Sequence, residues 1–366
     1  MTDGRVAGDS EPAEFHDAAE SILKRGLTCV DSHPALKGRN LNRVFSDAHG
    51  RKFLIKQLRN EAGVENRMHL LADAQNRLAE MHLDTPKLIG VDQRRRVAAY
   101  EFSTGEPLQI VLRAKKDSDA LWANLGRALG RLHSGNTGGL PVPHVDHRGG
   151  SSDPLLEFSF ADFWTLSAAE IELWRELQHV VRTEGLDLRA HPDVTRPVLV
   201  HYDLRLDQTL CRDDQVLLLD WEELRAGDRT RDLGMLFGDI LSEAIYGLLE
   251  HLDSSPVRAA DAVEVRMAEA GFRARRGIER VVDGYLQSLA EHDALGQLAA
   301  EDLLEQRVAR HMFRHLLERV ASRSAVSTKL TGIDRGILAI AMEIARQLPG
   351  AANAFGFNFS SRVSNA

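Results

Sequence analysis

The stretch HYDLRLDQ at residues 201–208 decides how the rest of the chain is interpreted. It follows the short apolar run at 198–200 and leads into a second apolar segment, which is typical of a loop between buried strands. Asp220 comes seventeen residues after Asp203, at the end of the apolar run 216–219. Carboxylates at strand ends can bind a hard cation or accept a proton, so this stretch predicts a reactive loop rather than a plain turn.

The spacing inside this loop points to phosphoryl transfer. Protein kinases use the pattern H-R-D-x-x-x-x-N with a second aspartate beyond it. Here Asp203 and Gln208 are five residues apart, and the amide oxygen of Gln208 can still bind a metal ion in place of asparagine. Asp220 stands in DWE where kinases have DFG. The pattern predicts Asp203 as the catalytic base and Gln208 and Asp220 as magnesium ligands. An isolated HxD tripeptide would carry little weight, because it is common.

Lys56 lies within the apolar run FLIKQL at 53–58. A lysine in a buried strand is costly unless it meets an anionic partner, and a kinase uses such a lysine on the nucleotide phosphates. Glu61 and Glu65 both lie early in the following helical segment, and Glu65 fits a partner role better because later residues continue its helical face. We therefore expect Lys56 to bind phosphate and to pair with Glu65. The alternative is a solvent-facing lysine on an edge strand.

Hydrophobic periodicity divides the chain into a smaller α+β part and a larger, mainly helical part. The smaller part is expected to hold helices at 13–25 and 61–82 and strands at 41–46, 51–58, 87–91 and 96–102, with a break at 103–105. The larger part is expected to be helical except for strands within 197–222, with four or five helices between 229 and 349 that break near 254–256, Gly271, His292 and Ser327. Phe355, Phe357 and Phe359 alternate near the C-terminus, which suggests a short strand or a docking apolar strip.

Several strings along the chain, in their order, resemble the aminoglycoside phosphotransferase and choline kinase-like superfamily. They run from about residue 38 to residue 235 and comprise GRNLNRVF, FLIK, PKLIG, YEFSTGEPL, LGRLHS, HYDLRLDQTL, LLLDWEE and GDRTRDLG. The resemblance implies an α+β, two-lobed protein-kinase-like fold. Its small β-rich N-lobe would span 13–105, and its large helical C-lobe, with the catalytic loop and a β insert, would span 106–349. Residues 1–12 would form a disordered tail and 350–366 a C-terminal tail.

The same resemblance implies site residues and cofactors. ATP and Mg²⁺ would bind between the lobes, with Lys56 on the phosphates. The other nucleotide-binding positions would be Glu65, Tyr100, Glu101, Phe102 and Arg205, of which Tyr100 to Phe102 border the adenine. Asp228 and Asp232 match the family string GDxxxDL, where a mainly structural role at a helix start is expected. The catalytic string of the family begins HGD and ends in Asn, so Tyr202 and Gln208 depart from it.

The acceptor is left open by these motifs, because related folds act on many substrates. The GRNLN start, the DLRLDQ loop and the long helical C-terminus resemble the kinase subunit of class V lanthionine synthetases. That resemblance implies phosphorylation of Ser or Thr in a ribosomally made precursor peptide, with a separate lyase as a partner. One alternative is a kinase for an aminoglycoside or another small-molecule antibiotic. A second is a pseudokinase or binding subunit of a biosynthetic complex, which Tyr202 and Gln208 favour and which retention of Lys56, Asp203 and Asp220 disfavours.

Composition limits the partners. The formal charge of −8 is uneven: residues 1–105 carry 16 Lys and Arg against 15 Asp and Glu, and the remainder carries 30 against 39. A nucleic-acid-binding protein would show a basic stripe, and no apolar run is long enough to span a membrane, so we expect neither partner. Two cysteines and a polar N-terminus favour a reducing cytoplasm. His144 and His147 lack the further ligands of a zinc site.

Overall fold

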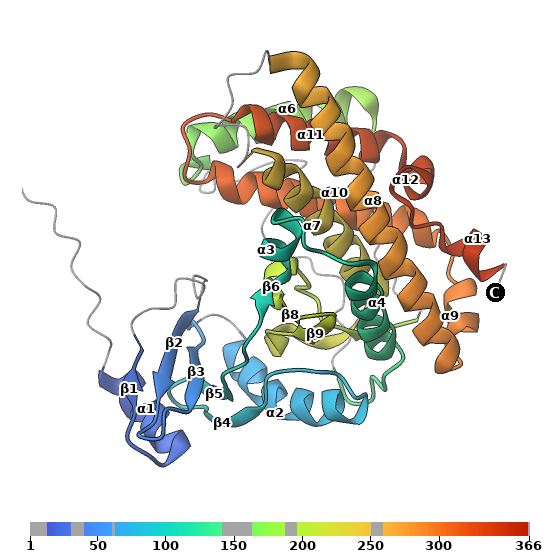
Figure 1. Ribbon diagram of the computed structural model, residues 1–366. Helices are drawn as coiled ribbons and strands as arrows, with labels where there is room; N and C mark the ends of the chain where they lie inside the picture. Colours follow the sequence, from blue (N-terminus) through green and yellow to red (C-terminus); the bar gives the residue numbers. More distant parts are fainter. Residues whose placement is uncertain are drawn as a thin grey trace, which may run out of the picture. The chain divides into compact units, whose positions relative to one another are not determined.

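The computed structural model describes residues 13–30, 40–60, 63–140, 163–186, 196–249 and 259–364 (Figure 1). The chain forms two compact units. The first unit comprises residues 1–104 and 217–223, and the second comprises 105–216 and 224–366. The short segment 217–223, which we expected within the C-lobe, is therefore grouped with the first unit. The predicted disordered tail at 1–12 lies outside the described residues.

The first unit is built on a five-stranded antiparallel sheet in which the strand order is β1-β2-β3-β5-β4. Its strands are β1 (Thr28–Cys29), β2 (Leu41–Ser46), β3 (Lys52–Gln57), β4 (Leu88–Asp92) and β5 (Val97–Glu101), and its helices are α1 (Ala13–Leu23) and α2 (Val64–Glu80). All but the short β1 match the predicted elements within a few residues. The apolar period of each segment therefore predicted its type correctly.

The β2–β3 hairpin turns at Asp47 to Gly50, between the strands predicted at 41–46 and 51–58. The Asp47 carboxylate accepts the backbone N–H groups of His49 and Arg51 at 2.9 and 3.0 Å. Gly50 has a φ of 74°, a conformation that glycine adopts without steric cost. The hairpin places β3 between β2 and β5, in the interior of the sheet.

Helices α1 and α2 bury their apolar faces in two separate clusters of the first unit. Phe15, Ala18 and Ala19 of α1 pack with Phe45 and other apolar strand residues. Residues of α2 pack with Ala98 in a second cluster, whose other buried members are Leu58, Val64, Met68 and Leu71. Both faces of the β3–β5 region are therefore covered by apolar side chains, which makes a charged side chain on β3 costly unless it is paired.

The second unit is mainly helical. Its described helices are α3 (Leu108–Arg113), α4 (Asp119–His133), α6 (Ala168–Glu184), α7 (Arg229–Leu249), α8 (Ala259–Glu291), α9 (Leu295–Ala299), α10 (Leu304–Ser324), α11 (Gly332–Arg346), α12 (Leu348–Phe355) and α13 (Phe359–Val363). Helix α4 packs along α8, and α7 packs along α10 (Figure 1). The α4–α8 contact depends on glycine, because a Cβ at Gly126 or Gly284 would lie 2.0 Å from a carbonyl oxygen of the facing helix.

Short strands carry the sequence that contains Asp203. Strand β7 (Val198–Val200) pairs with β10 (Arg225–Gly227), and β6 (Glu106–Pro107) pairs with β8 (Thr209–Arg212), which is followed by β9 (Gln215–Leu218). The 3-10 turns η1 (Leu206–Gln208) and η2 (Trp221–Glu223) lie between β7 and β8 and after β9. The stretch 201–208 is thus a loop between strands, as predicted.

Two local predictions for the helical part were wrong, and for a third one of its two alternatives is confirmed. Gly271 does not break a helix, because it lies inside α8 at a position where a side chain would meet open space. The four tryptophans are predicted to be core or helix-packing residues, but Trp164 is 71% exposed. The alternating phenylalanines do not form a strand. The alternative of a docked apolar strip is confirmed for Phe357 and Phe359, which are fully buried with their rings against those of Phe237 and Tyr285.

No helix among the described ranges combines the length and the apolar character that crossing a membrane requires.

Candidate active site

Lys56 is the centre of a charged cluster in the first unit. The residue is 7% exposed and lies opposite Asn42 of β2 and Ala98 of β5, so the alternative of a solvent-facing lysine on an edge strand is wrong. Its ammonium group forms ion pairs with Asp220 and with Glu222, the latter at 2.7 Å. The structure thus brings together Lys56 and Asp220, two of the predicted site residues that are far apart in the sequence.

The electrostatics of this cluster follow from one cation shared by two carboxylates. Burial lowers the pKa of Lys56, but Asp220 and Glu222 raise it by more, so its pKa lies above the ordinary value and the group stays charged. Burial and the neighbouring Asp220 raise the pKa of Glu222, against the opposing effects of Lys56 and Asn40. The cluster therefore carries an excess of negative charge, which favours an added cation.

The predicted partner of Lys56 was wrong. Glu65 is exposed in the first turn of α2, and the ion pairs of Lys56 go to Asp220 and Glu222. Glu222 is held by Asn40, whose amide donates to its two carboxylate oxygens at 3.0 and 3.3 Å. The strings DWEE and GRNLN contained both residues, but nothing in either string indicated that they meet. Gly38 and Arg39 of the GRNLN string lie outside the described residues.

The predicted adenine-bordering residues lie at the end of β5. Tyr100 is half-buried beside the cluster of Leu58 and Met68, and burial followed by the charges of Asp220 and Glu222 raises its pKa. Glu101 is exposed, and its carboxylate lies 3.4 Å from the ammonium group of Lys87. Phe102 stacks under the ammonium group of Lys52 at 5.9 Å. The first unit ends two residues later, at Thr104.

Asp203 lies in the second unit, and its side chain is 42% exposed. The nearest cation is Arg205, whose Nε is 3.7 Å from Asp203 Oδ1 and 3.2 Å from Asp207 Oδ1. Burial lowers the pKa of Arg205, but Asp203 and its neighbouring carboxylates raise it by more. An accessible carboxylate beside a fixed guanidinium can accept a proton from a bound hydroxyl group, which fits the role predicted for Asp203.

The backbone of this loop is held by two buried carboxylates of α7. Asp232 accepts the N–H groups of His201 and Tyr202 at 2.7 and 2.8 Å. Asp239 accepts the N–H group of Leu206 at 2.8 Å. The two anchors lie on either side of Asp203, so the loop conformation is fixed from the backbone. The predicted structural role of Asp232 agrees with these contacts, although Asp232 holds a loop rather than a helix start.

The anchors themselves are part of a buried polar network. His133 lies 3.3 Å from Asp232 through Nε2 and 2.9 Å from the Tyr285 hydroxyl through Nδ1. Burial raises the pKa of Asp239, but His315 at 3.0 Å and other partners lower it by more, so its pKa is about 2. Burial raises the pKa of Asp232 as well, but His133 and other partners lower it by more, so both carboxylates stay ionised near neutral pH. The sequence offered no signal for His133 or His315, since an isolated histidine on a helix is common.

Tyr202, where the family string has glycine, has a φ of 72°. This left-handed conformation is unfavourable for a bulky residue. The Tyr202 ring lies 3.7 Å from the guanidinium carbons of both Arg225 and Arg231, and Arg231 also donates to the Tyr202 carbonyl oxygen at 3.0 Å. Stacking on two guanidinium groups stabilises the ring and offsets part of the backbone cost. The departure from the family string is thus structurally accommodated.

The two predicted magnesium ligands belong to different units, Gln208 to the second and Asp220 to the first. Gln208 is half-buried at the end of η1, and its N–H group donates to the Arg205 carbonyl oxygen at 3.0 Å. Within the described residues, no group of three or more His, Cys, Asp or Glu side chains is arranged as a metal site. An amide and carboxylate oxygen set fits a hard cation such as Mg²⁺. His144 and His147 lie outside the described residues.

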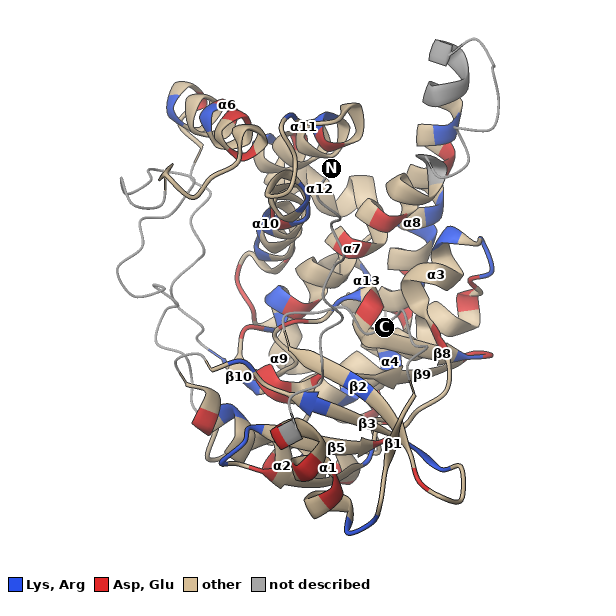
Figure 2. Cartoon of the chain, turned by 90° about the vertical axis from the view of Figure 1, so that its left-hand side faces the viewer, with Lys and Arg blue, Asp and Glu red and all other residues tan. Residues whose placement is uncertain are grey.

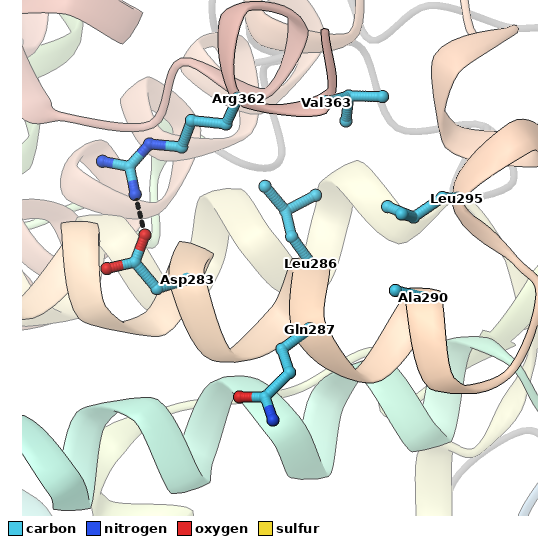
Figure 3. A pocket seen from close by; sticks show the side chains of 7 residues that line it. All are labelled: Asp283, Leu286, Gln287, Ala290, Leu295, Arg362 and Val363. Atoms are coloured by element: carbon cyan, nitrogen blue, oxygen red, sulfur yellow. Dashed lines mark hydrogen bonds and ion pairs between the residues drawn. The ribbon is translucent and has the colours of Figure 1, made fainter. Parts of the chain in front are cut away.

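A separate pocket of about 430 Å³ opens on the second unit between α8, α9 and α13 (Figure 3). Leu286, Ala290, Leu295 and Val363 give it an apolar lining, and an ion pair between Asp283 and Arg362 lies at one side. None of the predicted site residues lines it.

Comparison with known proteins shows the family to which the chain belongs. A family model described as "Phosphotransferase enzyme family" matches residues 34–253, more than half of the chain. No protein of curated function matches. Among solved structures, a choline/ethanolamine kinase family protein from Mesorhizobium loti is 16% identical with a TM-score of 0.50, and the match covers 94% of this chain and 98% of that one. A choline kinase from Cryptosporidium parvum Iowa II is 13% identical with a TM-score of 0.51, and the match covers 93% and 96%.

These structural similarities confirm the predicted kinase-like fold, with its small β-sheet region and large helical region. The predicted superfamily is also confirmed. The chain belongs to this phosphotransferase family, whose members are kinases that phosphorylate hydroxyl groups.

Proposed function

We propose that the protein transfers the γ-phosphoryl group of ATP to a hydroxyl group of its acceptor in a Mg²⁺-dependent reaction. The observation that carries this proposal is the buried cluster in which Lys56 meets Asp220 and Glu222. A lysine beside a carboxylate excess suits a magnesium–nucleotide complex, because the lysine can bind phosphate oxygens while the carboxylates favour the metal ion.

The residues take distinct roles in this proposal. When bound, ATP supplies the phosphoryl group and Mg²⁺ neutralises phosphate charge. Lys56 binds phosphate oxygens, and Asp220 and Gln208 hold the metal ion. Asp203 orients the acceptor hydroxyl and accepts its proton as the new oxygen–phosphorus bond forms, while the bond between the γ-phosphorus and the β–γ bridging oxygen breaks and ADP leaves. Arg205 lies beside Asp203 and helps to hold it in place, and Asp232 and Asp239 fix the loop around it.

For the acceptor, we propose a Ser or Thr hydroxyl of a ribosomally made precursor peptide, with a separate lyase as the partner enzyme. The support is the similarity of the GRNLN and DLRLDQ strings to kinase subunits of class V lanthionine synthetases. A small cationic antibiotic such as an aminoglycoside is the second candidate, because residues 106–366 hold 30 basic against 39 acidic residues.

Intact-mass spectrometry tests the reaction and the acceptor together. The protein is incubated with ATP, Mg²⁺ and either a Ser/Thr-containing peptide encoded beside its gene or an aminoglycoside panel. A phosphoryl-sized mass gain on the peptide, absent with Asp203→Asn, supports the peptide acceptor, and a gain on an aminoglycoside replaces it with the second candidate. Magnesium-dependent ATP binding without transfer in any combination, even with a candidate lyase added, would contradict the acceptors named here.

A further inference from the structure

Three arginines of the second unit are each held along one edge by a buried carboxylate. Arg113 of α3 and Arg319 of α10 both bond Glu243, and Arg323 of α10 bonds Asp334 at 3.0 Å. The side chains of Glu243 and Asp334 are 0% and 4% exposed, whereas those of Arg113, Arg319 and Arg323 are 24%, 25% and 46% exposed. The carboxylates are thus buried, whereas the arginine side chains are partly exposed, Arg323 most of all. We call these three arginines the arginine row.

Arg323 of the arginine row keeps hydrogen-bond donors for a further partner. Arg323 donates to Asp334 through Nε, and its guanidinium lies 4.6 Å above the Tyr246 ring. Its two terminal nitrogens have no hydrogen-bond partner among the described residues. The Tyr246 hydroxyl is also without one, although the residue is only 6% exposed. A guanidinium fixed on one edge presents its other edge as a planar pair of donors, which matches a carboxylate or phosphate group.

The arginine row is linked to the catalytic loop through one carboxylate. Asp239 accepts the N–H group of Leu206, three residues after Asp203, and lies 3.5 Å from Arg319 Nε. Helices α7 and α10, which supply Asp239 and Arg319, pack along each other, and basic residues recur along α10 (Figure 2). The row therefore begins next to the loop that carries Asp203.

We propose that the arginine row binds anionic groups, carboxylate or phosphate, of the acceptor whose hydroxyl is presented to Asp203. This inference rests on the proposed function and narrows its acceptor class. The guanidinium groups are already immobilised by Glu243, Asp239 and Asp334, so little side-chain entropy is lost on binding. The acidic balance of residues 106–366 repels anions in general, so attraction to one would come from this row. A peptide with acidic residues near its Ser or Thr has the required chemistry, and an aminoglycoside lacks it.

A binding measurement tests the row without relying on turnover. The probes are fluorescein-labelled Glu-Glu-Ser-Glu-Glu and Lys-Lys-Ser-Lys-Lys, and fluorescence anisotropy reports their dissociation constants on the full chain. We expect the glutamate peptide to bind at least about tenfold more tightly than the lysine peptide. Equal affinity, tighter binding of the lysine peptide, or no binding of the glutamate peptide at millimolar concentration would overturn the proposal.

Substitutions locate the binding. Arg323→Gln keeps a polar side chain but removes the guanidinium with the most exposed charge, and should weaken binding of the glutamate peptide about fivefold to tenfold. Arg319→Lys keeps the charge that compensates Asp239 and Glu243 but loses the planar fork, and should weaken it less. Arg346→Gln is the matched control, because Arg346 is a half-exposed arginine of the same unit that pairs with Glu184. Wild-type affinity in Arg323→Gln, or an equal loss in Arg346→Gln, contradicts the assignment.

Two further measurements complete the test. One asks whether the anion comes from a peptide or from a small polycarboxylate, and the other distinguishes failure of this inference from failure of the proposed function. Displacement of the glutamate peptide by tricarballylate assigns the row to small polycarboxylates as well as to peptides, and no displacement assigns it to peptides. Asp203→Asn should bind the glutamate peptide as the wild type does. A protein that binds this peptide through Arg323 but transfers phosphate to no acceptor contradicts only the proposed function. Transfer to a cationic acceptor, with an unchanged KM in Arg323→Gln, contradicts only the present inference.

Discussion

Lys56 and Asp203 lie in different units, and the chain holds them in different ways. Lys56 is buried in the middle of a sheet, and its contacts are ionic, with Asp220 and Glu222. Asp203 is far more exposed, and its position follows from backbone N–H groups on either side of it, which Asp232 and Asp239 bind. The first site depends on charge balance and the second on backbone geometry. Removing the charge of Lys56 should therefore lower the free energy of unfolding, whereas removing the charge of Asp203 should lower the rate of phosphoryl transfer.

The largest expected effect is the loss of turnover in Asp203→Asn. The amide has the shape of the carboxylate but cannot accept the hydroxyl proton, so the rate of phosphoryl transfer should fall at least about 100-fold. The anchors of the loop bind backbone groups, so the melting temperature and the affinity for ATP should not change. Transfer is measured by mass spectrometry and ATP affinity by calorimetry. If turnover persists within a few-fold of the wild type, another residue is the base.

Lys56→Met should destabilise the protein by about 2 kcal/mol near neutral pH, because it leaves the half-buried Asp220 and Glu222 without the Lys56 cation. Burial and the neighbouring Asp220 raise the pKa of Glu222, so Glu222 is protonated early as the pH falls and the loss should then shrink. The free energy of unfolding in urea measures this difference. Lys52→Met is the matched control, since Lys52 is an exposed lysine of the same strand. An equal and small loss in both variants would show that the Lys56 ion pairs do not stabilise the first unit.

Asp239→Asn should lower the free energy of unfolding by about 2 kcal/mol at pH 7, with a defined pH dependence. The pKa of Asp239 is about 2 in the folded chain, below its ordinary value of 3.8, so its ionised form favours folding. This stabilisation is present above the ordinary pKa and is lost as the pH falls from about 4 to about 2. Urea unfolding at several pH values should show the curves converging there. Asp302→Asn, at an exposed aspartate, serves as the control.

The smallest effect is expected at Tyr202. Tyr202→Ala keeps the unfavourable φ and loses the stacking on Arg225 and Arg231, and should destabilise the protein by about 1 to 2 kcal/mol. Tyr202→Gly also loses the stacking but relieves the backbone, and should lose about 1 kcal/mol less than alanine. Tyr202→Phe should match the wild type. If urea unfolding shows a lower free energy of unfolding for Tyr202→Gly than for Tyr202→Ala, the positive φ of Tyr202 does not cost stability.

The sequence allowed much of the first unit to be predicted, because its strands and helices follow clear periods of two and of three to four residues. The predicted helix break at Gly271 was wrong because a single glycine on a helix face with open space around it does not end the helix. For Phe357 and Phe359 the docked strip was predicted correctly and the strand was not. These residues flank a helix start after Gly356, whose φ is 83°, and a period of two over three residues does not distinguish this from a strand.

In the site, Lys56, Asp203 and Asp220 could be singled out because each stands next to an apolar run. The partners of these residues could not. Asp220 lies 164 residues from Lys56, and local spacing predicted the nearby Glu65 instead. Helical periodicity indicates which residues share a face of a helix. It does not indicate which segment, distant in the sequence, packs against that face. Asp239 and His315 were missed for the same reason. Their pairing depends on how α7 packs along α10.

The interrupted course of the chain through the first unit has a consequence during synthesis. Residues 1–104 leave the ribosome well before residues 217–223, which complete this unit. At usual elongation rates the delay is on the order of ten seconds. During that time Lys56 has neither Asp220 nor Glu222 beside it, so the nascent sheet holds an uncompensated interior cation. The first unit therefore reaches its full stability only after much of the second unit has been translated. An isolated N-terminal fragment that ends at Thr104 is expected to be less stable than the first unit in the whole chain.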